Sequence, residues 1–165
     1  MGCGKSSIGK VLQTRLGCRL IDLDDFIEAK AGKKIPDIFK ESGEPAFRKM
    51  EAEALKEIID SEKGRDTVIL SLGGGAVMTP ECFFLVKKHT ECVYLRATVD
   101  TLVATLSGYE AQRPMLSGDE DLRTKVTGLM SKRASTYEAV ASYITDIDGV
   151  SYENTADDII KHFSL

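Results

Sequence analysis

The amino end of the chain carries residue types that bind a nucleotide phosphate. Gly4, Lys5 and Ser6 match the last three positions of the phosphate-binding loop pattern G-x-x-x-x-G-K-[ST]. In that pattern, backbone N–H groups surround the phosphate oxygens, the lysine reaches the terminal phosphates and the serine hydroxyl ligates Mg2+. The leading glycine of the pattern, and the strand that feeds the loop, would lie before Met1. The motif predicts phosphoryl transfer from a nucleotide.

The residues after this motif predict the helix that a phosphate-binding loop needs. Apolar residues recur at helical spacing at Ile8, Val11, Leu12 and Leu16, and Gly17 is a plausible end. The loop therefore opens a helix whose amino end favours an anion. The alternative is that these glycines form a flexible tail, which would make the helical pattern a coincidence.

Two carboxylates follow a short β run at residues 19–21. Asp22 and Asp24 are two positions apart, so both would point to one face if the strand continued. Ligands of parallel sheets collect at the carboxyl ends of strands. One carboxylate would then orient Mg2+ through water, and the other would accept a hydroxyl proton. Alternatively, Asp24 caps the next helix, a role compatible with the first.

Three consecutive glycines follow the buried run at residues 67–72. Gly73, Gly74 and Gly75 would let a ligand touch the backbone at the carboxyl end of this strand, or would simply form a tight strand-to-helix turn. Ser71 stands where many phosphate-binding-loop proteins have an acidic residue. We therefore expect Asp22 to support the Mg2+.

Three arginines are candidates for binding anions, although each taken alone is more typical of a solvated surface residue. Arg113 lies in a polar segment, residues 108–118, that is bounded by glycines. Such a segment predicts a lid that closes an arginine over a phosphate and excludes water. Arg48 and Arg133 have the forked guanidinium that suits a substrate carboxylate.

The elements that must position these residues alternate between strand and helix. Short β runs occur at 19–21, 67–72, 92–95 and 143–145. Between them the sequence predicts helices over 25–31, from 44–45 onward, from 79–81, from 98, from near 119 and over 155–163, with a short turn at 35–36. This alternation is typical of an α/β fold with a parallel sheet.

Length and composition narrow the class of partner. The chain has 165 residues, 42% of them apolar, which fits one domain with its own core. Its net charge of −4 offers no broad basic surface for nucleic acid. No apolar run approaches the roughly 18 residues of a membrane span, and no secretory signal is visible. We expect a cytoplasmic protein with small-molecule partners and no membrane or nucleic-acid partner.

Cysteine and histidine do not predict a metal centre. The four cysteines are scattered without C-x-x-C pairing, which favours free thiols: Cys3, Cys18, Cys82 and Cys92. His89 and His162 have no carboxylate or cysteine at ligand spacing, so we expect solvated residues at helix ends.

The sequence resembles the shikimate kinase family over nearly its whole length. The resemblance is carried, in order and approximate spacing, by Asp22-Leu23-Asp24, Phe47-Arg48, Leu72-Gly73-Gly74-Gly75-Ala76, Arg113-Pro114 and Lys132-Arg133-Ala134 with Tyr137. It implies a three-layer P-loop kinase fold, with a parallel sheet flanked by helices. It also implies one domain over residues 1–165, with the phosphate loop at 1–6, a helical substrate-binding segment at about 24–60 and a lid at about 107–119.

The resemblance implies transfer of the ATP γ-phosphate to the 3-hydroxyl of shikimate, with Mg2+, in aromatic amino-acid biosynthesis. By it, Asp24 activates the hydroxyl, while Lys5 and Arg113 stabilise the transferring phosphoryl group. Ser6 ligates Mg2+ directly and Asp22 acts through water. ATP would contact Gly2, Cys3, Gly4, Lys5, Ser6, Ser7 and Arg113; shikimate would contact Asp24, Arg48, Gly73, Gly74, Gly75 and Arg133. A monomer is expected.

The sequence departs from the family in two places. Thr105-Leu106-Ser107 replaces the family's adenine-contacting arginine, and the late adenine loop corresponds only loosely to residues 149–155. The family also has about ten residues before Met1. Two alternatives therefore stay open beside the active enzyme: a truncated, impaired relative that binds nucleotide or shikimate, and a kinase for another small polyol such as gluconate.

Overall fold

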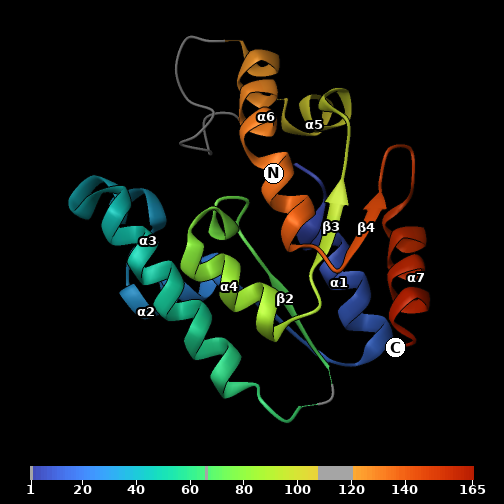
Figure 1. Cartoon of the computed structure of the whole chain (residues 1–165), viewed down its shortest axis with the longest axis horizontal. Coiled ribbons are helices and arrows are strands. Elements are labelled where there is room, and N and C mark those ends of the chain that lie inside the picture. Colours follow the sequence, from blue (N-terminus) through green and yellow to red (C-terminus); the bar gives the residue numbers. More distant parts are fainter. Residues whose placement is uncertain (1, 66, 108–120) are drawn as a thin grey trace.

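The structure is a computed structural model that describes residues 2–65, 67–107 and 121–165 (Figure 1). Strands and helices alternate along the described chain, as the sequence predicts. The strands are β1 (Arg19–Asp22), β2 (Val68–Ser71), β3 (Val93–Arg96) and β4 (Tyr143–Asp146). The helices are α1 (Lys5–Leu16), α2 (Leu23–Ala31), α3 (Ile35–Ser61), the 3-10 turn η1 (Ala76–Met78), α4 (Pro80–His89), α5 (Val99–Leu106), α6 (Leu122–Val140) and α7 (Tyr152–Phe163).

The strands form two parallel pairs rather than the single sheet that we expected. β1 pairs with β2, from Arg19 opposite Val68 to Asp22 opposite Ser71. β3 pairs with β4, from Val93 opposite Tyr143 to Arg96 opposite Asp146. Within the described ranges no ladder joins β2 to β3, although β2 and β3 line the same cavity. The α/β class and the parallel strand direction are confirmed, and the one continuous sheet is not.

Helices cover the two strand pairs from both faces (Figure 1). One apolar cluster packs α2, α3 and α4 around Leu23, Leu55 and Val86, all at most 1% exposed. Another joins α1 to α7 through Ile8 and Ile159. These helices hold the carboxyl ends of the strands, where the candidate site lies.

Most helix ends follow the sequence signals, and three differ from our predictions. α3 consists of two helices joined at Gly43, where φ is 77° and ψ is 171°: the first replaces the short turn predicted at 35–36, and the second begins at 44–45 as predicted. α6 begins after Asp121, whose carboxylate accepts from the Thr124 N–H. α7 begins three residues earlier than predicted, because the Ser151 hydroxyl accepts the Asn154 N–H as an N-cap.

Neither the histidines nor the cysteines form a centre of their own. His89 and His162 are exposed near the carboxyl ends of α4 and α7, as predicted. All four cysteines are free. Over the described ranges, no cluster of three or more histidine, cysteine or acidic residues could hold a metal ion, and no helix is long and apolar enough to cross a membrane.

Candidate active site

The loop before α1 has the backbone geometry of a phosphate cradle. Gly2 and Gly4 adopt φ values of 71° and 72°, a region that residues with a Cβ rarely enter. A Cβ on Gly4 would also lie 2.6 Å from a ring carbon of Tyr152, and one on Gly2 would lie 2.9 Å from Leu106. Both positions therefore need glycine for conformation and for space.

The amino end of α1 is electrostatically prepared for an anion. Its N-cap is Gly4, which has no side chain to accept the first N–H groups, and its first turn contains no acidic residue. These N–H groups and the helix dipole favour a negative charge, and Lys5 adds a cation. Ser6 is exposed on the same turn. The tail alternative is wrong for the described residues, since the loop opens a twelve-residue helix.

The two aspartates are not side by side on a strand, because β1 ends at Asp22 and α2 begins at Leu23. Asp22 is the N-cap: its Oδ1 accepts from the N–H of Asp24 at 3.0 Å and of Asp25 at 3.5 Å. Our alternative of Asp24 as the cap is therefore wrong. Asp24 lies in the first turn of α2, and its carboxylate is free of that structural task.

Asp24 lies in an environment that disfavours its charge. Burial, followed by the neighbouring carboxylate of Asp22, raises the pKa of Asp24 above its ordinary value of 3.8, and Lys5 opposes this shift. The influence of Lys5 links the phosphate loop to this carboxylate. A carboxylate with a raised pKa is a stronger base for accepting a hydroxyl proton.

The glycine segment, residues 73–75, is where the substrate candidates meet. A Cβ on Gly73 would lie 3.1 Å from Oδ1 of Asp24, and one on Gly75 would lie 2.8 Å from Nη2 of Arg48. Arg133 Nη1 donates to the Gly74 carbonyl at 3.3 Å. Gly75 has φ −95°, so this glycine serves close approach and not an unusual backbone conformation. Three residues from α2, α3 and α6 thus converge on one turn.

Arg48 is held by two carboxylates that we did not single out in the sequence. Its Nη1 donates to Glu51 Oε2 at 2.8 Å, and its Nη2 donates to Glu44 Oε1 at 3.0 Å. Glu51 is 1% exposed, and burial raises its pKa even though Arg48 lowers it. Spacings of i+3 and i−4 from Arg48 on a helix are the signal that would have identified both.

Tyr137 also binds the glycine segment. Its hydroxyl donates to the Gly74 carbonyl, the same acceptor that Arg133 uses. Its ring packs against Tyr94 with centroids 5.3 Å apart. Tyr137 follows Arg133 by four residues on α6, so one face of that helix supplies both donors. Arg113 and nearly all of the predicted lid fall outside the described residues.

A second cavity adjoins the phosphate loop, with a volume of about 370 Å³. Its lining joins the loop to α5 and to the segment before α7: Gly2, Cys3, Gly4, Thr101, Thr105, Ile147, Gly149, Val150, Ser151, Tyr152 and Glu153. This size lies in the range of small-ligand sites. It includes Thr105 and most of the loop at residues 149–155, where we predicted no firm adenine contacts.

Comparison with known proteins agrees with this geometry. A family model described as shikimate kinase matches residues 1–164. The chain belongs to the shikimate kinase family. The shikimate kinase of Thermus thermophilus is 36% identical over 161 residues, covering 98% of this chain and 84% of the relative. That of Francisella tularensis subsp. novicida is 36% identical over 159 residues, covering 96% and 88%.

Solved structures of shikimate kinases have the same fold. The enzyme from Acinetobacter baumannii, solved in complex with shikimate, superposes with a TM-score of 0.89 at 30% identity and covers 99% of this chain and 88% of its own. The enzyme from Bacteroides thetaiotaomicron gives a TM-score of 0.88 at 30% identity, covering 100% and 94%. The P-loop kinase fold that the resemblance implied is therefore confirmed.

Proposed function

We propose that this chain transfers the γ-phosphate of ATP to the 3-hydroxyl of shikimate. Its family is named after this reaction, which is a step of aromatic amino-acid biosynthesis. The observation that carries the proposal is the convergence of Asp24, Arg48 and Arg133 on the glycine segment. One carboxylate and two guanidinium groups around bare backbone suit a ligand with a hydroxyl to be deprotonated and a carboxylate to be bound.

ATP binds with its phosphates on the loop that precedes α1. The N–H groups of this loop and the ammonium group of Lys5 face the phosphate oxygens, and the lysine compensates charge on the group being transferred. The nucleoside end extends into the 370 Å³ cavity, whose wall includes Tyr152 and Thr105. Arg113, on the lid, adds a second cation to the phosphoryl group.

Shikimate binds with its ring on the glycine segment and its carboxylate on Arg48 and Arg133. Asp24 receives the proton of the 3-hydroxyl as the oxygen attacks the γ-phosphorus; the new P–O bond forms while the bond to ADP breaks. Its raised pKa makes it a better proton acceptor than an ordinary carboxylate. A fixed base and a fixed carboxylate clamp hold the acceptor in line, which supplies much of the acceleration in such reactions.

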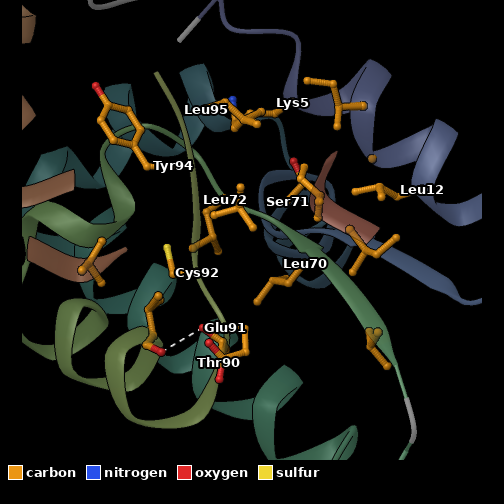
Figure 2. A pocket seen from close by; sticks show the side chains of 18 of the residues that line it. Lys5, Leu12, Leu70, Ser71, Leu72, Thr90, Glu91, Cys92, Tyr94 and Leu95 are labelled. Carbon is orange, nitrogen blue, oxygen red and sulfur yellow. Dashed lines mark hydrogen bonds between the residues drawn. The ribbon is translucent and has the colours of Figure 1, made fainter. Parts of the chain in front are cut away.

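The residues near the loop fit a bound Mg2+. Ser71 is 8% exposed and its Oγ is a buried polar atom without a hydrogen-bond partner, on the cavity wall that also includes Lys5 (Figure 2). Ser6 would hold the ion directly, with Asp22 and Ser71 holding its waters. Bound Mg2+ would neutralise charge on the β- and γ-phosphates. Asp22 uses one oxygen, Oδ1, as the helix cap, which leaves Oδ2 for such a water.

An ADP-release assay with a panel of acceptors tests this function. With ATP and Mg2+, we expect turnover with shikimate and less than a hundredth of that rate with gluconate. Turnover with gluconate instead would favour the other-polyol alternative. Binding of shikimate or nucleotide without turnover, in a folded protein, would favour the impaired relative. The protein is expected to act as a monomer, as its resemblance to the family implies.

A further inference from the structure

All three nitrogens of the Arg48 guanidinium donate to carboxylates of the protein. Nε and Nη2 donate to the same oxygen, Oε1 of Glu44, at 3.2 Å and 3.0 Å. Nη1 donates to Oε2 of Glu51 at 2.8 Å. A guanidinium binds a carboxylate most strongly along one edge, through two parallel N–H donors. Glu44 therefore occupies the edge formed by Nε and Nη2, which a substrate carboxylate would otherwise use.

The charges around Arg48 leave little room for a further anion. Glu44 and Glu51 already place two carboxylates on one guanidinium. A substrate carboxylate would be the third, and carboxylates at this separation repel one another. Arg133 adds one more cation, so that three carboxylates would face two guanidinium groups. If one protein carboxylate moves away, the charges balance.

Burial decides which of the two carboxylates can move. The side chain of Glu51 is 2% exposed, whereas that of Glu44 is 57% exposed. Without Arg48, Glu51 would be a buried carboxylate without a partner, which is strongly destabilising. Glu44 would instead be hydrated by solvent, and exposed ion pairs contribute little to stability. Glu44 is therefore the carboxylate that gives way.

The backbone beside Glu44 allows this movement while Arg48 stays in place. Glu44 directly follows Gly43, the joint between the two helices of α3, where φ is 77°. Arg48 lies further inside the second helix and has two other anchors. One is the buried Glu51, and the other is the ring of Phe47, whose centroid lies 5.4 Å from the guanidinium carbon. Loss of the Glu44 contact therefore leaves Arg48 positioned.

We propose that Glu44 is an internal competitor for the substrate carboxylate: it occupies the Nε–Nη2 edge of Arg48 and is displaced when shikimate binds. The inference rests on the proposed function, because it takes the acceptor's carboxylate to be the ligand of Arg48. Glu44 thus weakens the binding of every anion at this position. Its effect is opposite in sign to that of Glu51, which holds Arg48 for the substrate.

The test compares residues 1–165 with Glu44→Gln, which removes the charge, and Glu44→Ala, which also removes the acceptor. By calorimetry, the Kd for shikimate should be about three- to fivefold lower in both variants, with the Kd for ATP unchanged. The neutral methyl ester of shikimate should bind all three proteins equally, because it brings no charge to compete. The control is Glu81→Gln, an exposed carboxylate in the first turn of α4. It makes the same change in net charge and should bind shikimate as wild type does.

A second ligand separates this inference from the proposed function. Benzoate carries a carboxylate but no hydroxyl to phosphorylate, and the amide NMR signal of Gly75, against which Arg48 lies, reports its binding. Benzoate should saturate both Glu44 variants at a concentration about three- to fivefold lower than wild type. An unchanged or higher Kd for benzoate in both variants would overturn the internal competitor. Tighter benzoate binding in proteins that all fail to bind shikimate would support the competitor and overturn the proposed function.

Discussion

Arg48 and Glu51 form an ion pair one helical turn apart on α3, with 2.8 Å between Nη1 and Oε2. The Glu51 side chain is 2% exposed and that of Arg48 is 20% exposed. The guanidinium lies against Gly75, so this pair sets where a substrate carboxylate can bind. Buried charges are tolerated when paired, and removing one partner leaves the other uncompensated.

Replacing Glu51 should therefore loosen Arg48. We expect Glu51→Gln to raise KM for shikimate about tenfold, equivalent to ~1.4 kcal/mol of binding, with KM for ATP unchanged. The matched control is Glu53→Gln on the same helix, where an exposed carboxylate lies 3.9 Å from Lys49. Exposed pairs contribute little, so this control should behave like wild type. Equal effects of both variants in steady-state kinetics would contradict the role of Glu51.

Asp24 should control the pH dependence of the reaction. The base must be ionised to accept a proton, so kcat/KM should rise with pH along a limb whose apparent pKa lies above 3.8. Asp24→Asn should lower kcat about 10²- to 10⁴-fold and remove that limb. A variant that kept the limb would show that another group is the base.

The same substitution should stabilise the fold at neutral pH. Because the folded pKa of Asp24 is raised above the unfolded value of 3.8, the folded state binds more protons between these two values. The free energy of unfolding therefore falls as pH rises through that window, and this loss persists at pH 7. Asp24→Asn should be more stable than wild type at pH 7, by about 0.5–2 kcal/mol, and equal to it below pH 3.8. Urea unfolding at both pH values measures this; lower stability at pH 7 would be contrary to the raised pKa.

The absence of a side chain at Gly75 should be essential for binding the shikimate carboxylate, because Arg48 lies against this residue. A Cβ there would lie 2.8 Å and 2.9 Å from the two terminal nitrogens of Arg48. Gly75→Ala should displace the guanidinium and raise KM for shikimate at least tenfold. Gly128→Ala is the control, because nothing lies within 4 Å of a Cβ at that position inside α6. The control should keep its kinetics and gain about 0.4–1 kcal/mol of stability. Unchanged KM in Gly75→Ala would rule out this packing role.

Tyr137 should position the glycine segment through one hydroxyl. Tyr137→Phe leaves Arg133 as the remaining side-chain donor to Gly74 among the described hydrogen bonds. A hydrogen bond of this kind contributes about 1 kcal/mol, so KM for shikimate should rise roughly fivefold while the fold is kept. Tyr94→Phe, which keeps the ring pair, is the control and should change nothing. Identical kinetics for the two variants would assign Tyr137 to packing alone.

The sequence was most informative where residue type alone decides the structure. The glycine and lysine of the loop, and the four short β runs, predicted their elements closely because each depends on local conformation. The aspartates were harder. Strand periodicity placed Asp22 and Asp24 on one face, whereas capping ended β1 at Asp22 and turned Asp24 onto a helix. Competition between a strand and a cap is not visible in residue spacing.

The site partners that the sequence missed act across the tertiary fold. In the sequence, Glu51 is one of many acidic residues on a predicted helix. Its importance comes from its burial beside Arg48, which only the folded structure shows. The convergence of α2, α3 and α6 on the glycine segment depends on how those helices pack. The division into two strand pairs likewise depends on long-range pairing, which single-strand patterns do not contain.

The most direct test of the proposed function is transfer of labelled γ-phosphate. Residues 1–165 are incubated with Mg2+, shikimate and ATP carrying 32P in the γ position, beside the variant Lys5→Ala. We predict label on shikimate, as its 3-phosphate, at a rate at least a hundredfold lower in the variant. Label on water or another acceptor but not on shikimate, with the protein folded, would contradict the account.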